Sequence, residues 1–265
     1  MNSMTLAEYQ LKQQVAASFS RAAPDYDRVA ELQRQVADTL LRHLPAHDYT
    51  RVLDLGTGTG YGLTALRQAY PRADLIALDI AEGMLRHTAL CQAHLSVHPL
   101  CADAESLPLA DQSLDLICSS LAVQWCQDYP ALFSECARVL RPGGELHLAT
   151  LGPESLWQLR QAWRAVDAER HVNEFVADAV LLQASQSLRL LQQQTQCYTL
   201  EYDNLMAVLQ ALKTLGASVV IGREATGLGG RRRLQALAQA YATLQSAAGR
   251  LPLSYQVYYF RWRKE

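Results

Sequence analysis

The 265-residue chain has no uncharged apolar run near the roughly 18 residues that a membrane-spanning helix needs. Its first residues, MNSMTLAEYQLKQQ, have no basic start followed by an apolar stretch, so we expect no secretory signal and a cytoplasmic protein. Charged residues are also scarce, at 19%, whereas hydrophobic residues make up 49%. This balance excludes a disordered chain and predicts a folded core.

Paired cysteine motifs are absent as well, because none of the six cysteines forms a C-x-x-C. One cluster has a spacing that could suit zinc: Cys91, His94, His98 and Cys101. This stretch reads as the end of a helix followed by a strand, whose alternation sends His98 and Cys101 to opposite faces. We therefore expect no metal, and we expect reduced cysteines as in a cytosolic protein.

Charge is distributed unevenly, although the net charge is only −2. From residue 205 onward there are nine basic and two acidic residues, so this segment carries +7 and residues 1–204 carry −9. Such a segment suggests a face for an anionic partner, with an ordinary solvated surface as the alternative. Its candidate partner-binding residues lie in a glycine- and arginine-rich loop, 222–233: Arg231, Arg232 and Arg233, with Arg223 as a further candidate.

Short apolar segments alternate with helical ones over residues 50–151, which predicts βαβ units and a parallel sheet covered on both faces. Residues 5–45 read as helices interrupted by a loop at 20–28. The expected strands are 51–55, 73–80, 95–103, 114–120, 141–151, 187–202 and 254–264. The later helices are expected at 123–140, 153–167, 172–184, 204–215 and 233–247. We interpret 1–265 as one domain with a helical cap (1–48), a cofactor-binding core (50–151) and a substrate and partner part (152–265).

The stretch VLDLGTGTG is the most informative motif. A strand carrying Asp54 is followed by Gly56, Gly58 and Gly60, which allow a sharp turn and close approach of a ligand. A dinucleotide motif, G-x-G-x-x-G, would need glycine where Tyr61 or Leu63 stands. The spacing therefore disfavours an NAD-dependent dehydrogenase.

Carboxylates follow the next two expected strands, Asp79 in LIALDI and Asp103 in CADAESLPL. The carboxyl ends of parallel strands form the ligand site of an open α/β sheet, so these side chains should face a common pocket. Helix caps or turns are the alternative for each residue. A pocket rich in carboxylates, without a phosphate-binding lysine, favours a cationic cofactor over a pyrophosphate.

Together, VLDLGTGTG, LIALDIAEGML, CADAESLPLADQSLDLICSSLAVQW and ARVLRPGGELHLATL resemble the class I S-adenosylmethionine-dependent methyltransferases. The resemblance implies a Rossmann-like α/β fold with a seven-stranded sheet, order 3-2-1-4-5-7-6, in which only strand 7 is antiparallel. It also implies S-adenosylmethionine as cofactor and S-adenosylhomocysteine as product. The implied contacts are the methionine portion for Gly56, Gly58 and Gly60, the ribose for Asp79, adenine for Asp103 and Ala104, and the glycine loop for Asp54.

The flanks, FSRAAPDYDRVAELQRQVADTLL and GRR…LQAL…LPLSYQVYYF, resemble one subfamily, the malonyl-acyl carrier protein O-methyltransferases of biotin synthesis. This resemblance implies an acidic carrier protein as partner, without nucleic acid or membrane. A carboxylate is already a nucleophile, so we expect no general base, only positioning and desolvation. The candidate positioning residues are Tyr26, Trp125, Arg223 and Arg231, with ordinary packing as the alternative for the two aromatic residues.

Other functions remain open at this point. One is methylation of another small carboxylic acid or of a quinone precursor, which the core alone does not distinguish. A nucleic-acid methyltransferase is disfavoured because SSLAVQW stands where an N/D-P-P-Y-type motif often lies. A non-catalytic cofactor-binding protein is disfavoured because the glycine motif and its carboxylates are intact.

Overall fold

The computed structural model describes residues 5–215 and 230–265. One seven-stranded sheet runs through it in the order β3-β2-β1-β4-β5-β7-β6. The strands are β1 (Arg51–Leu55), β2 (Asp74–Asp79), β3 (Val97–Cys101), β4 (Leu114–Ser120), β5 (Leu140–Leu151), β6 (Arg189–Tyr202) and β7 (Leu251–Arg263). Only β7 runs antiparallel to its neighbours, β5 and β6, so the predicted strand order and direction are confirmed.

Helices cover both faces of the parallel part because side chains alternate along each strand. Val52 of β1 packs on α3 (Leu63–Ala69), with Leu41 of α2 (Glu31–Leu41) beside it. Leu53, the next residue, faces a different cluster built on α5 (Tyr129–Val139) and α7 (Asp178–Ala184). The apolar strand β1 is therefore buried on both sides.

Several helical boundaries differ from the prediction. Residues 123–125 form a separate 3-10 turn, and α5 starts after Asp128, whose side chain caps the backbone N–H of Ala131. The helix expected at 153–167 is α6 (Trp157–Arg164), because Leu156 takes a left-handed φ of 60° and its N–H donates to Ser254 of β7. Residues 172–177 are not helical, and the buried Val172 joins the core around β7.

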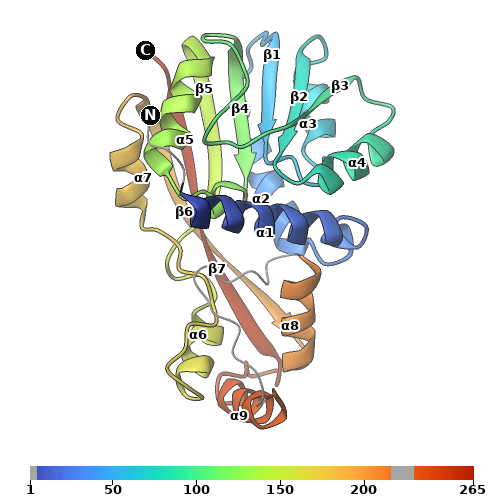
Figure 1. Ribbon diagram of the computed structural model, residues 1–265, viewed down its shortest axis with the longest axis vertical. Coiled ribbons are helices and arrows are strands. Elements are labelled where there is room, and N and C mark those ends of the chain that lie inside the picture. The colour runs from blue at the N-terminus through green and yellow to red at the C-terminus, as the bar shows by residue number, and fades with distance from the viewer. Residues whose placement is uncertain (1–4, 216–229) are drawn as a thin grey trace.

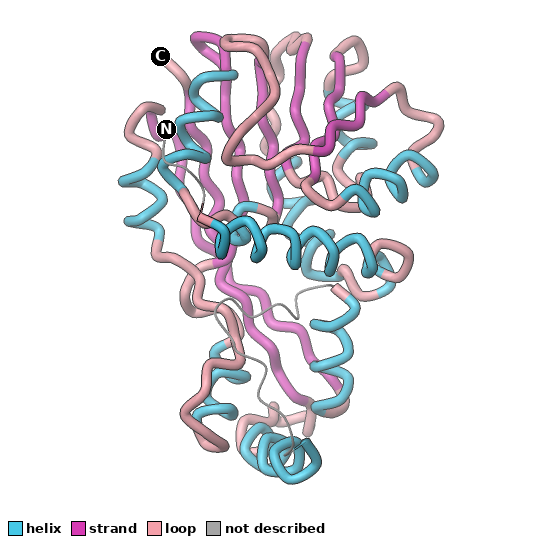
Figure 2. Tube along the Cα trace, in the orientation of Figure 1, coloured by secondary structure: helices cyan, strands magenta, loops and turns pink. Residues whose placement is uncertain are grey.

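The end of the chain builds a projection on the sheet. β7 pairs with β6 over Leu251–Arg263 but with β5 only from Val257, so a two-stranded ribbon extends past β5. Around this ribbon lie α6, α8 (Leu205–Thr214) and α9 (Gly230–Ala242), as Figure 1 shows, and Figure 2 shows the two strands continuing below the parallel ones. The predicted loop over 231–233 is wrong, since these arginines lie in the first turn of α9.

The N-terminal helix α1 (Leu6–Ala22) lies across the carboxyl ends of the parallel strands (Figure 1). It approaches α4 (Glu82–Cys91) so closely that a Cβ on Gly83 would stand 2.7 Å from the Cα of Ser20. The Gly83 N–H also donates to the Ser20 hydroxyl at 3.1 Å. Within the described residues, none of the helices, α1 included, has the length and apolar character to cross a membrane.

Candidate active site

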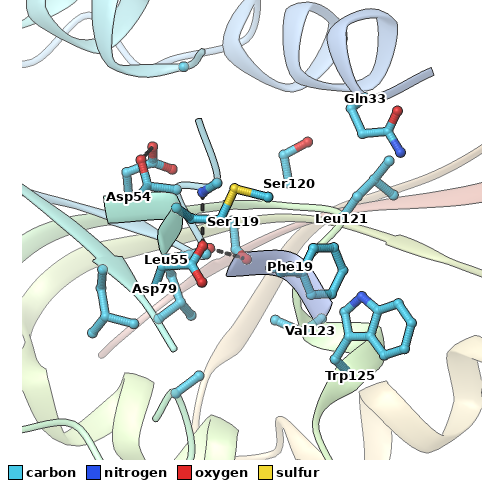
Figure 3. Close-up of a pocket in the computed structure, with 18 of the residues that line it drawn as sticks. Phe19, Gln33, Asp54, Leu55, Asp79, Ser119, Ser120, Leu121, Val123 and Trp125 are labelled. Atoms are coloured by element: carbon cyan, nitrogen blue, oxygen red, sulfur yellow. Dashed lines mark hydrogen bonds between the residues drawn. The ribbon is translucent and has the colours of Figure 1, made fainter. Parts of the chain in front are cut away.

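A deep cavity lies where the carboxyl ends of β1, β2 and β4 meet α1 and α2. Figure 3 shows the carboxylates of Asp54 and Asp79 at one end of it, and the rings of Phe19 and Trp125 at the other. Its wall includes all the residues predicted to hold the cofactor except Gly60: Asp54, Gly56, Gly58, Asp79, Asp103 and Ala104. The structure therefore brings together side chains that are up to about fifty positions apart in the sequence.

The glycine loop is held in a conformation that disfavours other residues. The N–H groups of Gly56 and Thr57 donate to the carbonyl of Leu78 at 2.8 and 2.9 Å. Gly56 has φ +76°, and a Cβ there would stand 2.2 Å from the Cβ of Ala122. Gly58 also has a positive φ, but a Cβ on it would meet no described atom within 4 Å, so it faces open space. Gly60 is packed against Thr88 instead, behind the cavity wall.

Two buried carboxylates give this cavity its chemical character. Asp54 accepts from the Thr57 hydroxyl at 2.7 Å, and burial raises its pKa to about 6. Asp79 accepts from the N–H groups of Gly58 and Ala81 at 2.9 and 2.8 Å, and burial raises its pKa as well. No described basic side chain forms an ion pair with either carboxylate. Buried unpaired anions are unfavourable, so this cavity fits a cationic ligand.

A buried lysine that the sequence reasoning missed closes the end near Asp103. Lys12 of α1 lies 2.6 Å from Asp103 and 2.5 Å from Glu105, and its side chain is 9% exposed. Glu105 in turn accepts from the N–H groups of Gln127 and Asp128. The available signal was the spacing of Lys12 with Val15 and Phe19, which puts a charged residue on the apolar stripe of α1.

The two aromatic candidates, Tyr26 and Trp125, both line the cavity. Tyr26 lies in a 3-10 turn after α1, and burial together with the nearby Asp79 and Asp27 raises its pKa. Trp125 packs edge-on against Phe19 with ring centroids 5.3 Å apart. The ring of Phe19, a residue that the sequence did not indicate, also lies beside that of Tyr26, with ring centroids 6.5 Å apart. Phe19 and Trp125 form an apolar wall opposite the carboxylates (Figure 3), and Tyr26 lies between this wall and Asp79.

A second, smaller cavity adjoins the first. The two share wall residues from α1, α2 and the segment after β4: Phe19, Tyr26, Gln33, Leu121 and Trp125. Apolar side chains from β5, α6 and α8 form much of the rest: Leu151, Leu156, Leu159, Leu212 and Leu215. His171 and Asn173 supply polar groups to this wall. A ligand placed here would lie next to one in the first cavity.

The predicted partner-binding arginines have different environments. Arg233 donates to Asp167 at 2.5 Å and to Glu169 at 2.9 Å, so its charge is paired within the chain. Arg232 is exposed. Arg223 and the side chain of Arg231 lie outside the described residues. Asp167, Glu169 and His171 have the geometry of a possible metal group, but Arg233 binds both carboxylates, which accounts for the cluster as an ion-pair network.

Comparison with known proteins places this site in a family. A domain family described as "Methyltransferase domain" matches residues 53–148. A malonyl-acyl carrier protein O-methyltransferase from Laribacter hongkongensis is 43% identical, and the match covers 98% of this chain and 92% of that protein. The chain belongs to the malonyl-acyl carrier protein O-methyltransferase family. The predicted membership is thereby confirmed, including the flanks that carried the resemblance.

Two further similarities are informative in different ways. A biotin biosynthesis bifunctional protein, BioHC, from Saccharophagus degradans is 42% identical over 96% of this chain, which spans about half (47%) of that relative's length. A crystal structure of a putative methyltransferase from Bacillus halodurans has a TM-score of 0.62, with 16% identity, and covers 87% of this chain and 99% of the other. At that identity the second similarity supports the Rossmann-like methyltransferase fold alone.

Proposed function

We propose that this protein transfers the methyl group of S-adenosylmethionine to the free carboxylate of malonyl-acyl carrier protein, an early step of biotin synthesis. The comparison with family members of nearly equal length supports the substrate. The observation that carries the chemistry is the pair of cavities: an anionic one that fits a cationic cofactor, opening into an apolar one that can hold an acyl group. The buried carboxylates of Asp54 and Asp79 make the first cavity anionic, which favours a cofactor that carries positive charge on its sulfonium and ammonium groups.

Each end of the first cavity has a role in this proposal. Asp79 retains lone pairs on both oxygens after its two backbone hydrogen bonds, so it can accept from the ribose hydroxyls. Asp103 and the backbone of Ala104 would face adenine, next to Lys12. Gly58 leaves room for the methionine portion, while Gly56 lets the glycine loop pack against Ala122. The cofactor supplies an electrophilic methyl group, and the protein orients and shields it.

The reaction needs no general base because the acceptor is already an anion. A carboxylate oxygen forms the new C–O bond as the methyl–sulfur bond breaks, and the electron pair of that bond stays on sulfur. The aromatic wall of Phe19, Tyr26 and Trp125 excludes water from the carboxylate, and desolvation of an anionic nucleophile increases its reactivity. Correct alignment supplies the rest of the rate enhancement.

The direct test is mass spectrometry of malonyl-acyl carrier protein after incubation with the protein and S-adenosylmethionine. A gain of one methyl group that fragmentation locates on the carboxylate of the malonyl group supports the proposal. Acetyl-acyl carrier protein, which lacks the carboxylate, should gain nothing. Methylation of free malonate or of a quinone precursor, with none on the carrier substrate, would show that the substrate is a different small molecule.

The carrier protein is proposed to dock on the basic α9 region. Arg232 is the described, exposed arginine among the predicted docking residues, and carrier proteins of this family are expected to be acidic. We expect Arg232→Glu to raise the KM for malonyl-acyl carrier protein a few-fold at low salt, because rim charges act mainly on the encounter rate. Arg28→Glu is a suitable control, since Arg28 is 80% exposed and lies after α1. If Arg28→Glu raises the KM for malonyl-acyl carrier protein as much as Arg232→Glu does, the carrier protein docks elsewhere. The same conclusion follows if Arg232→Glu raises the KM for malonyl-coenzyme A equally.

The raised pKa of Asp54 predicts a pH dependence of cofactor selectivity. Below a pH of about 6 the free protein protonates this carboxyl, which removes part of the attraction to the sulfonium. S-adenosylhomocysteine has an uncharged sulfur. The ratio of the affinity for S-adenosylmethionine to the affinity for S-adenosylhomocysteine should therefore fall between pH 7 and pH 5, by at most about tenfold. Titration calorimetry of both ligands measures the ratio. In Asp54→Asn the ratio should not change with pH. A ratio that does not change with pH in the unaltered protein would contradict the prediction.

A cytoplasmic location is part of the proposal. The six cysteines are free thiols, and Cys118 and Cys136 are buried in the core, as is typical of proteins from a reducing compartment.

A further inference from the structure

His171 occupies an unusual position in the wall of the second cavity. It lies between α6 and α7, and its side chain is 1% exposed. Its ring stacks on Trp163 with centroids 3.7 Å apart and planes 14° apart. Nε2 stands 2.7 Å from the Asp167 carboxylate, so this nitrogen carries a proton and donates it. The ring is thus fixed in position and orientation.

The other ring nitrogen has no such partner. Nδ1 of His171 is buried and makes no hydrogen bond to any described residue. Gln33 lies in the part of the wall that both cavities share, and its Oε1 is also buried without a hydrogen bond to any described residue. A buried polar atom without a partner is unfavourable, so two of them in residues of one cavity wall indicate a ligand that supplies the missing hydrogen bonds.

Few positive groups can hold a substrate anion in these two cavities. Lys12 is engaged by Asp103 and Glu105 at the adenine end. Arg34 lines only the first cavity and donates to the carbonyl of Asp27 at the 3-10 turn. Of the described residues in the wall of the second cavity, His171 is the one whose side chain can become a cation.

We propose that His171, as an imidazolium, binds the carboxylate of the malonyl group through Nδ1–H and so selects a free acid as substrate. This inference rests on the proposed function and names the residue that recognises the acceptor. Gln33, at the junction of the cavities, offers its amide to the same carboxylate. Asp167 is a positioning residue because it holds the ring through Nε2.

Charges of both signs lie beside the His171 ring. Asp167 and Glu169 face His171 on the Nε2 side, and Arg233 binds both carboxylates from α9 while lying 3.3 Å from Nε2. The substrate carboxylate would add a negative charge on the Nδ1 side. Methyl transfer converts it to a neutral ester, which no longer pairs with the imidazolium, so the same contact favours substrate binding and product release.

His171→Gln tests the inference, because glutamine can still hydrogen-bond Asp167 but cannot carry a charge. We expect the KM for malonyl-acyl carrier protein to rise at least tenfold, with the affinity for S-adenosylhomocysteine and for the methyl-ester product unchanged. His98→Gln, at an exposed site on β3, is the matched control and should behave as the unaltered protein. A folded His171→Gln variant with a KM within twofold would overturn the inference.

A second measurement does not depend on the variant folding. Histidine labelled with ¹⁵N in the unaltered protein should show the Nδ1 resonance of one ring moving toward the imidazolium value when malonyl-pantetheine is added, and not when acetyl-pantetheine is added. No difference between the two ligands would refute the contact. A separate activity assay on the same preparation tests the proposed function. If the unaltered protein methylates no malonyl thioester, the proposed function itself fails.

Discussion

Replacing Asp79 with Ala should weaken binding of S-adenosylhomocysteine by about 1.5–3 kcal/mol, or roughly 10- to 150-fold. Burial raises the pKa of the Asp79 carboxyl group, and a ribose hydroxyl bound to its carboxylate form would make a charge-assisted hydrogen bond. The same side chain also holds the glycine loop through the Gly58 N–H at 2.9 Å. Loss of the carboxylate therefore removes both a ligand contact and a support of the loop that surrounds it.

Asp74→Ala is the matched control, because Asp74 begins the same strand at its exposed end, about 3.9 Å from Arg51. Titration calorimetry should show no change of affinity for this control. Differential scanning calorimetry separates a contact from general unfolding, since Asp79→Ala must still melt cooperatively for the affinity to be interpreted. Unchanged affinity would mean that Asp79 only caps the turn after β2. Binding of NAD more tightly than S-adenosylhomocysteine would contradict the cofactor assignment itself.

The sheet could be predicted from the sequence because its signals are local. Each parallel strand is a short apolar run ending near a turn, and VLDLGTGTG identifies the strand at which the order reverses. The strand directions were implied by the family resemblance, and the structure confirms them. The starts of α6 and α7 could not be predicted in this way. They depend on contacts such as that of Leu156 with Ser254, nearly a hundred residues away.

The candidate site was predictable to the extent that its residues lie at strand ends. Asp54, Asp79 and Asp103 follow from that rule, whereas Lys12 and His171 come from a helix and a loop that the tertiary structure places over the cavities. Arg233 illustrates the opposite error. A cluster of arginines in sequence looks like one surface, but Arg232 is exposed whereas Arg233 pairs with Asp167 from a distant segment.

Lys12→Met should destabilise the protein by about 3 kcal/mol, because it leaves Asp103 and Glu105 as neighbouring buried acids without their cation. We take the lower end of the usual range because Asp103 is 27% exposed. For a chain of this size the midpoint of thermal unfolding should fall by roughly 6–12 °C. The helix α1 should also become more susceptible to protease, since Lys12 ties it to the segment after β3.

Two variants test this explanation against simple loss of a side chain. Arg28→Met removes an ion pair whose partners are 80% and 63% exposed, so its effect should stay below about 1 kcal/mol. Adding Glu105→Gln to Lys12→Met removes one unpaired charge, while the amide oxygen can still accept from the N–H of Gln127. The double variant should therefore be more stable than Lys12→Met alone. If it is less stable, the lysine contributes through packing and not through charge, and α1 is held mainly by its apolar side chains.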